Sequence, residues 1–412
     1  MIGWTTRGPM QEEVLKTLFW TSSGLAGYVY AGYPLAAGLL ARLRISSSQT
    51  ELDVPLPSVS LIISAFNEDA VIADKLLNSL ALDYPPELLE TIVVSDGSTD
   101  RTNEIVDEYA SSRVRLVRQH TRLGKSAGIN AGMSIASGEV VVFSDANAIY
   151  ERDALSKLVK HFTDPGVGYV VGNARYRKRS GQAASADSEG LYWRLETWLK
   201  QKESLLGSVV GGDGAIYAIR RELFTPLRPT DINDLLNPLQ IIARGYRGVY
   251  EPEAICYEDA GDSFEKEFQR KVRIVSRSIN AVVREPKVLL PWCQFPHWFC
   301  LVSHKLLRWF APLFLAVALG SSLVLWHTSF YKLMAIVQLS FYGLAFFAAV
   351  IGPRRAKSRF LYLPYYFCLV NLASAAGILK FIRGSLSPTW ETVRQGESAP
   401  EERPASAVGK ES

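Results

Sequence analysis

The stretches ETIVVSDGSTD (residues 90–100) and EVVVFSDAN (residues 139–147) decide the fold of this chain. In each, a short apolar run ends at an aspartate, Asp96 or Asp145. Similar runs stand at 59–64 and 114–117, and helical patterns follow the four runs, beginning near Glu68, Ser98, Lys125 and Arg152. Apolar strands that alternate with helices are typical of a parallel sheet covered on both sides. The sequence therefore predicts an α/β domain with a mostly parallel sheet and helices on both faces.

Four further segments, residues 17–41, 309–331, 333–353 and 360–379, contain no charged residue. A helix that crosses a bilayer needs about 20 mostly apolar residues. A buried core helix of that length seldom lacks charge on every side. We therefore expect all-α transmembrane segments on both sides of the α/β domain, and hence a lipid bilayer around the chain.

Positive charge indicates the orientation of these segments. Arg42 and Arg44 follow the first one directly, and positive residues favour the cytoplasm. The α/β domain is therefore expected in the cytoplasm, and the chain is expected to be an integral protein of a bacterial inner membrane. Four spans would put the tail outside, whereas Lys380 and Arg383 favour the inside, so the side of the tail stays open.

Residues 264–283 form a basic amphipathic pattern just before the later spans. Apolar residues recur there at helical spacing, while Arg270, Lys271, Arg273 and Arg277 fall mostly on other faces. Such a helix is typical of a membrane interface. Residues 288–302 suggest a second interfacial helix, and 173–207 are expected to be largely helical. The predicted division is anchor 1–44, α/β domain 45–260, interfacial helices 261–303, transmembrane helices 304–383 and polar tail 384–412.

Charge and cysteine content exclude some functions. The net charge of +4 is small and is accounted for near the membrane, so we expect no nucleic-acid partner. The four cysteines have no CxxC spacing, which indicates neither a disulfide framework nor a zinc site.

The carboxyl ends of the predicted strands carry the candidate chemistry, because ligands of open α/β sheets bind there. Asp96 could bind a ribose or base edge, assist a metal, or belong to an ordinary Asp-Gly turn. Asp145 and Asn147 supply the hard oxygens that Mg²⁺ or Mn²⁺ prefer, or cap a strand. Asp234, beside Asn233 at an apparent helix start, is either a general base or a helix cap.

Two glycine-containing stretches add to this set. Gly124-Lys125-Ser126 opens a helix and could hold phosphate oxygens, although it is not a Walker A loop. Gly211-Gly212-Asp213-Gly214 could let the backbone approach a ligand closely, or be a plain loop. Glu68 follows the first predicted strand and falls in the same crevice.

Taken in order, six motifs resemble those of inverting family-2 glycosyltransferases, the membrane-bound group that includes cellulose, chitin and hyaluronan synthases. They are SAFNE (64–68), SDGSTD (95–100), GKSAGINAG (124–132), SDAN (144–147), GGDGAIYAIRR (211–221) and IND (232–234). The resemblance covers residues 20–394, including the membrane segments. It implies a GT-A-like fold, a nucleotide-sugar donor with UDP as the expected carrier, a glycan or lipid-linked acceptor, and Mg²⁺ or Mn²⁺.

The resemblance also implies roles for single residues. Glu68 and Asp96 would contact the nucleoside, and Lys125 would lie near the nucleotide. Asp145 would be the principal metal ligand, with Asn147 where many members have a second acid. Asp234 would be the catalytic base, and the turn with Gly212, Asp213 and Gly214 would border the acceptor.

One departure concerns chain elongation. Processive members carry Q-x-x-R-W on an interfacial helix, whereas Arg273 here has no Gln three residues before it and no Trp after it. Arg273 could still bind the diphosphate, but the missing Trp leaves open whether one sugar or many are added. Other interpretations are a polyprenyl-phosphate monoglycosyltransferase and a non-catalytic membrane scaffold. The need for a partner subunit also stays open.

Overall fold

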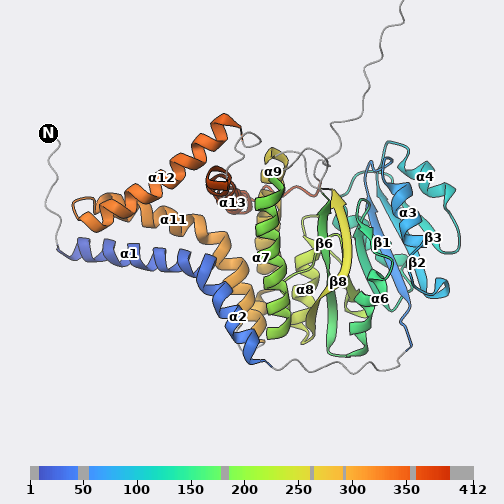
Figure 1. Cartoon of the computed structure of the whole chain (residues 1–412). Coiled ribbons are helices and arrows are strands. Elements are labelled where there is room, and N and C mark those ends of the chain that lie inside the picture. The colour runs from blue at the N-terminus through green and yellow to red at the C-terminus, as the bar shows by residue number, and fades with distance from the viewer. Residues whose placement is uncertain are drawn as a thin grey trace, which may run out of the picture.

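A twisted eight-stranded sheet forms the centre of the α/β domain in the computed structural model (Figure 1). The structure describes residues 9–44, 55–177, 185–259, 264–290, 294–352 and 359–389. The strand order is β3-β2-β1-β4-β7-β6-β8-β5. Residues 45–54 and 353–358, and most of the predicted polar tail, lie outside the described residues.

Four strands confirm the four apolar runs of the sequence. They are β1 (Val59–Ala65), β2 (Leu89–Asp96), β3 (Val114–Gln119) and β4 (Val140–Asp145), and they pair in parallel. The remaining strands are β5 (Ile149–Tyr150), β6 (Val167–Arg177), β7 (Tyr217–Arg220) and β8 (Arg247–Asp259). All but β5 and β7 run in the same direction, so the prediction of a mostly parallel sheet is confirmed.

The prediction that residues 173–207 are largely helical is wrong at its start. Residues 173–177 continue β6, because they pair with Ile255–Asp259 of β8. Pairing with a neighbouring strand overrides a local pattern in such cases. The helix α7 begins only at Ser185 and ends at Leu206.

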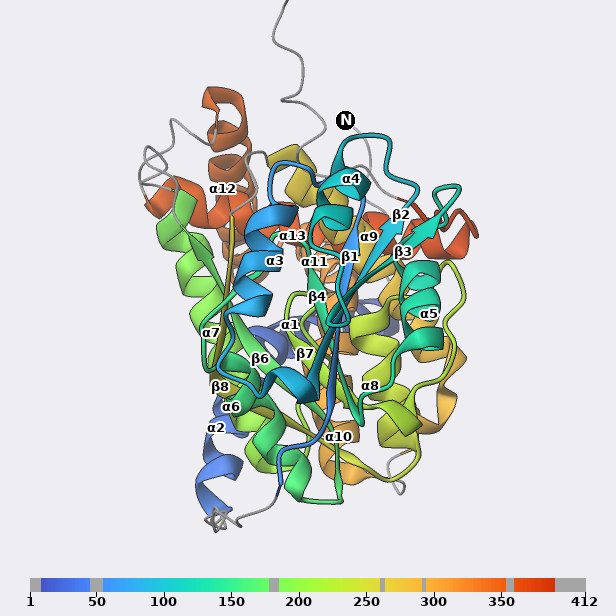
Figure 2. The same cartoon turned by 90° about the vertical axis from the view of Figure 1, so that its right-hand side faces the viewer.

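Helices cover both faces of the sheet, as predicted (Figure 2). On one face lie α3 (Ile72–Leu80), α4 (Thr102–Glu108) and α6 (Ala154–Val159); on the other lie α5 (Lys125–Ile135), α7 and α8 (Asn233–Ala243). Strand β1 shows why. Leu61 and Ile63 belong to one hydrophobic core, whereas Ile62 belongs to the other. Side chains of a strand alternate between faces, so a continuous apolar run serves two cores.

Within the described residues, three helices are long and apolar enough to cross a membrane. They are Phe295–Val324, which combines α10 (Phe295–Cys300), a π-helical turn (Leu301–Leu306) and α11 (Leu307–Val324); α12 (Ser329–Ile351); and the part Phe360–Ile382 of α13 (Arg359–Ile382). Two predicted boundaries are wrong. A turn at 325–328 interrupts the expected span 309–331, and the expected interfacial helix 288–302 largely merges into the first of the three.

The N-terminal segment is a helix interrupted by a π-helical turn. It consists of α1 (Pro9–Gly27), the turn Tyr28–Gly32 and α2 (Tyr33–Leu43). It is not one of the three candidate spans, so its role as an anchor stays a prediction. Phe19 of α1 nevertheless packs with Ala318 and Tyr331 of the later helices.

The predicted amphipathic helix is confirmed as α9 (Phe264–Arg284). It packs closely on α13: a Cβ atom added to Gly377 of α13 would lie 2.8 Å from Cβ of Val275. Figure 1 shows α1, α11 and α12 extending away from the sheet, whereas α13 is seen nearly end-on beside α9. After α13 the chain passes α9, where the carbonyl of Ser387 accepts a hydrogen bond from Arg277, and Pro388 then lies against Gly124 of the α/β domain.

Candidate active site

The reversed strand β7 brings a distant loop to the carboxyl end of β4. Tyr217 of β7 pairs with Phe143 of β4 in antiparallel register. The residues just before Tyr217, including Gly212, Asp213 and Gly214, therefore lie beside the end of β4, where Asp145 stands. The parallel strands β1 and β2 end at the same edge, which brings Asp96 there too.

Three predicted site residues converge on Gly214. The ammonium group of Lys125 donates hydrogen bonds to the carboxylate of Asp145 and, at 3.3 Å, to the carbonyl of Gly214. A Cβ atom added to Gly214 would lie 3.4 Å from Lys125 Nζ, 3.5 Å from Asp234 Oδ2 and 3.9 Å from Asp145 Oδ2. The lack of a side chain at Gly214 therefore leaves space between a cation and two carboxylates.

Asp234 is the second residue of α8, and its carbonyl accepts a hydrogen bond from the N–H of Gly212. Its pKa is raised, mainly by burial and further by the charges of Asp213 and Asp145, against the opposing effect of Lys125 and Arg273. A carboxylate with a raised pKa is a stronger base, so the environment suits proton abstraction.

Asn233, the residue that departs from the family pattern, points away from this space. It is buried, and its amide donates a 2.8 Å hydrogen bond to the hydroxyl of Tyr217. Asn237, one turn further along α8, donates to the same hydroxyl at 3.1 Å. The departure therefore changes a contact in the core and leaves the Asp234 carboxylate in the site.

Asp213 forms an ion pair with Lys200 of α7, with a distance of 3.1 Å between Nζ and Oδ2. Both side chains have only about a seventh of their surface exposed. The turn predicted to border the acceptor is thus fastened to α7 on one side and, through Gly212, to α8 on the other.

Asp96 holds the loop that leads into α5. Its carboxylate accepts hydrogen bonds from the N–H groups of Leu123, at 2.7 Å, and Gly124, at 2.9 Å. Burial raises the pKa of Asp96, and these bonds oppose the rise. The carboxylate thereby fixes the backbone just before Lys125. The N–H of Glu68 donates a 2.9 Å hydrogen bond to Oγ1 of Thr102, at the start of α4. Asn147 lies in the turn that follows Asp145.

Two charged residues at this edge were missed by the sequence analysis. Glu258 lies near the end of β8, where burial, together with Asp145 and Asp213, raises its pKa to about 8. Lys75 of α3 is fully buried below the turn that follows Asp145. Neither belongs to one of the recognised motifs, so only the strand order and the helix packing identify them.

Helix α9 contributes positive charge to the site. Burial lowers the pKa of Arg273 to about 10, with Arg277 and Arg270 acting in the same direction and Asp145 and Asp234 opposing them. Arg273 is thus within the electrostatic influence of the two carboxylates predicted to matter most.

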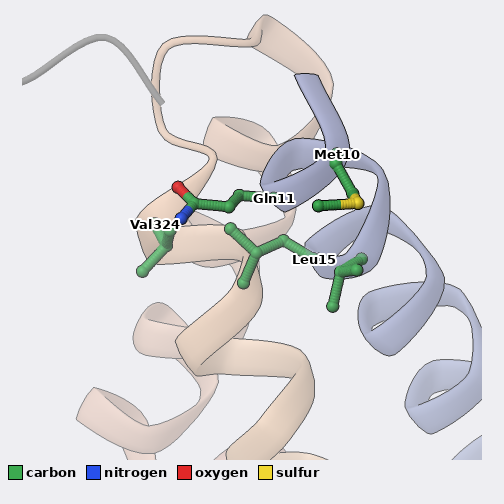
Figure 3. A pocket seen from close by; sticks show the side chains of 5 residues that line it. Met10, Gln11, Leu15 and Val324 are labelled. Carbon is green, nitrogen blue, oxygen red and sulfur yellow. The ribbon is translucent and has the colours of Figure 1, made fainter. Parts of the chain in front are cut away.

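In the described part of the chain, no group of three His, Cys, Asp or Glu residues is arranged to hold a metal ion by itself. Cys256, Cys300 and Cys368 are free thiols. A pocket lined by Met10, Gln11, Val14, Leu15 and Val324 lies between α1 and α11 (Figure 3). It is at the ends of these helices that point away from the sheet, and it has no part in the site.

Comparison with known proteins agrees with this geometry. Residues 60–227 match the family model described as glycosyl transferase family 2, and this range contains Lys125, Asp145 and the Gly211–Gly214 turn. The chain contains a glycosyl transferase family 2 domain. Asp234 lies just beyond the matched residues, at the start of α8.

Curated proteins that are similar to this chain include poly-beta-1,6-N-acetyl-D-glucosamine synthases. The protein from Staphylococcus aureus is 27% identical over 248 residues, which are 58% of this chain and 59% of the relative. The protein from Staphylococcus epidermidis is 22% identical over 278 residues, or 66% and 65% of the two chains. The chain thus matches about three fifths of the length of the Staphylococcus aureus relative.

A solved structure supports the fold of the family 2 domain and its helices. It is the mannosyltransferase PcManGT from Pyrobaculum calidifontis in complex with GDP-Man and Mn²⁺. The similarity has a TM-score of 0.65 at 22% sequence identity and covers 90% of this chain and 98% of that one. The GT-A-like fold expected from the sequence is therefore confirmed.

Proposed function

We propose that this chain is a membrane-bound inverting glycosyltransferase, which moves a sugar from a nucleotide sugar to an acceptor hydroxyl. The observation that carries the proposal is the convergence of Lys125, Asp145 and Asp234 on the space that Gly214 leaves by lacking a side chain. The ammonium group of Lys125 and the carboxylate of Asp145, which lie together beside that space, suit a diphosphate and its counter-ion. A separate carboxylate with a raised pKa suits a base.

The proposed base is Asp234. It accepts the proton of the acceptor hydroxyl while the hydroxyl oxygen bonds to the anomeric carbon of the donor sugar. The bond from that carbon to the phosphate oxygen breaks, and the nucleoside diphosphate leaves with the electron pair. Because the attack comes from the face opposite the leaving group, the configuration at the anomeric carbon inverts. The turn with Gly212, Asp213 and Gly214 borders the acceptor in this arrangement.

The diphosphate is proposed to lie near Lys125 and Arg273, whose positive charges oppose the charge that develops on the leaving group. Glu68 and Asp96 are proposed to contact the nucleoside, with Asp96 acting also through the loop that it holds at Leu123 and Gly124.

The donor groups at this edge fit a divalent cation. Mg²⁺ and ions like it are commonly held by one or two carboxylates together with substrate phosphates, so the absence of a three-ligand cluster among the described residues is compatible with a metal. Burial, followed by the negative charges of Asp145 and Asp213, raises the pKa of Glu258 at the same edge, so a cation placed there would meet carboxylates of three residues. Asp145 and Asn147 are the proposed ligands of Mg²⁺ or Mn²⁺, which would neutralise charge on the departing phosphate.

The curated relatives suggest which donor and location to test first. Their names make them synthases of poly-beta-1,6-N-acetyl-D-glucosamine, so UDP-N-acetylglucosamine is the first donor and a glycan or lipid-linked glycan the first acceptor. The three apolar helices support an integral membrane protein. We propose the cytoplasmic face of a bacterial inner membrane as the site of the reaction, because Arg42 and Arg44 precede the α/β domain.

The test is release of the nucleoside diphosphate by the detergent-solubilised protein, with UDP-N-acetylglucosamine, UDP-glucose and GDP-mannose in turn and with Mg²⁺ or Mn²⁺. Sizing of the sugar product separates a polymer from a single addition. Asp234→Asn is expected to lower kcat by about 10²- to 10⁴-fold, the usual loss with a general base. The matched control is Asp164→Asn, a carboxylate that pairs with Arg247 just before β6, and it should keep full activity. Equal activity of Asp234→Asn and the wild-type protein would refute the assignment of the base.

A further inference from the structure

Lys75 is an unusual residue because its side chain is fully buried. It lies on α3 and has 0% of its surface exposed. Lysine is almost never fully buried without compensation, since removing an ammonium group from water is costly. Burial accordingly lowers the pKa of Lys75 to about 7, against the opposing charges of Cys256, Asp145 and Glu258. A group retained at such a cost calls for an explanation in terms of what it contacts.

The ammonium group of Lys75 contacts the segment that follows Asp145. Its ammonium group donates a hydrogen bond to the carbonyl of Ala148, the residue directly after Asn147. It also lies 3.9 Å from the centroid of the Tyr150 ring, a distance typical of a cation–π contact. The lysine therefore fixes the backbone and the next aromatic side chain immediately after the proposed metal ligands.

A second residue of α3 completes the attachment. Asn78 stands one turn after Lys75. Its side-chain oxygen accepts a hydrogen bond from the N–H of Tyr150, and its side-chain nitrogen donates one to the carbonyl of Tyr150, each at 2.8 Å. The Tyr150 hydroxyl in turn donates to the carbonyl of Ala215 at 2.9 Å, next to Gly214. Helix α3 thus holds the turn after Asp145 and, through Tyr150, the loop that borders the acceptor.

We propose that Lys75 is a positioning residue that keeps the Asp145–Asn147 turn in the shape required to bind a divalent cation. The inference rests on the proposed function, in that Asp145 and Asn147 are the ligands. Residues that orient metal ligands commonly change metal affinity by about 10- to 100-fold when they are lost. In this proposal Lys75 does not contact the metal ligands themselves. It acts on them indirectly, through the backbone at Ala148 and the ring of Tyr150.

The direction of the change in cation affinity when Lys75 is removed distinguishes a positioning role from a purely electrostatic one. Removing a buried positive charge near the site would, by charge alone, strengthen the binding of a cation. A weaker affinity after removal of Lys75 is therefore a result that only loss of the ligand geometry produces.

The experiment measures the Kd of Mn²⁺, by the electron paramagnetic resonance signal of free Mn²⁺, for the full-length protein in detergent. Lys75→Met is expected to raise this Kd about 10-fold or more. Lys157→Met is the matched control, because Lys157 is a lysine of α6 that pairs with Asp153, and it should leave the Kd unchanged. An unchanged or lower Kd in folded Lys75→Met overturns the inference.

Asn78→Ala provides the second variant, because it removes the other half of the attachment and keeps the lysine. It is expected to raise the Kd of Mn²⁺ as well, and it decides the matter if Lys75→Met does not fold: an unchanged Kd in Asn78→Ala then overturns the inference. A wild-type protein that binds no Mn²⁺, with or without UDP, overturns the proposed metal ligands and the inference together. If the wild-type protein binds Mn²⁺ and the Lys75→Met and Asn78→Ala variants bind it with the same Kd, the inference on Lys75 is overturned and the proposed metal ligands are not.

Discussion

The side chain of Asn233 donates a 2.8 Å hydrogen bond to the hydroxyl of Tyr217, so two consecutive residues of α8 have opposite surroundings. Asn233 is in the core, whereas the carboxylate of Asp234 faces the space at Gly214. The family pattern has an acid at the position of Asn233. The structure indicates how such an acid would change the pKa of the neighbouring Asp234.

Asn233→Asp is predicted to move the acidic limb of the pH profile of kcat to higher pH. The tyrosine hydroxyl can donate to the new carboxylate, so the fold should persist, while the added negative charge raises the pKa of Asp234 further. A base works only when deprotonated, so activity is lost as the pH falls through its pKa, and a higher pKa brings that loss at a higher pH. Asn233→Ala removes the hydrogen bond without adding charge, and its profile should not shift. A downward shift in Asn233→Asp would contradict the assignment of Asp234.

Gly214→Ala is predicted to abolish activity without unfolding the protein. The added methyl group would sit at ordinary contact distances from Lys125 Nζ and Asp234 Oδ2, and the backbone of Gly214 is not in the left-handed region. The methyl would nevertheless occupy the space assigned to the reacting groups. We expect a fall in kcat/KM of about 100-fold or more, in line with the effect of small displacements in active sites. The thermal midpoint should match that of the control Gly320→Ala, whose added Cβ meets nothing within 4 Å.

Glu258→Gln is predicted to stabilise the metal-free protein at about pH 8 and to have little effect near pH 4.5. The folded protein holds the pKa of Glu258 at about 8, above that of an unfolded chain. Between those two values the unfolded state releases a proton that the folded state retains, so the wild-type protein loses stability as the pH rises. Glutamine cannot ionise and removes this loss. Thermal midpoints measured in EDTA at both pH values test the prediction, and an equal effect at both would rule out ionisation as the cause.

Glu203→Ala is predicted to destabilise the junction between α7 and the membrane helices. The buried Glu203 carboxylate accepts hydrogen bonds from Tyr33 at 2.7 Å and from the N–H of Val210 at 3.1 Å, and pairs with His304 at 2.6 Å. Breaking a buried charge pair costs about 3–5 kcal/mol. The thermal midpoint should fall by many degrees, whereas Glu104→Ala, which breaks an exposed pair with Arg101, should change it little.

Acid should weaken the same junction in the wild-type protein. Burial by itself would raise the pKa of Glu203, but the charge of His304 and the hydrogen bonds outweigh it and leave the pKa below its usual value. The stabilisation is therefore present above the ordinary pKa of a glutamate and is lost as the pH falls below it. A thermal midpoint that falls on acidification in the wild-type protein, and less so in Glu203→Ala, is the expected result.

The sequence predicted the parts of this fold that depend on local pattern. The strands β1 to β4 are continuous apolar runs, and each is followed by a helix, so period and composition identify them without knowledge of the tertiary structure. The start of α7 was wrong because residues 173–177 are held by pairing with β8, a partner about 80 residues away. The boundary at 325–328 was missed because Trp326 and His327 are uncharged and do not interrupt an apolar count.

The residues of the candidate site could be predicted from the sequence where they belong to a recognisable motif. Asp145, Lys125 and Asp234 stand in such motifs, and the structure brings them together. Lys75 and Glu258 could not be found in this way, because a lysine on a helix and a glutamate near a strand end are usually exposed. Lys75 is buried because α3 packs below the turn that follows Asp145. Glu258 lies at the site because β8 pairs with β6 in the sheet.

The contact of Gly377 with Val275 has a mechanical consequence. At Gly377 the backbone of α13 lies directly against the Val275 side chain and the Val272 carbonyl of α9, the helix that carries Arg273. A helix adjusts its tilt to the thickness of the surrounding lipid, and we expect a change in the tilt of α13 to displace α9 with it. The choice of lipid or detergent is thus expected to affect the position of Arg273, the residue proposed to hold the diphosphate.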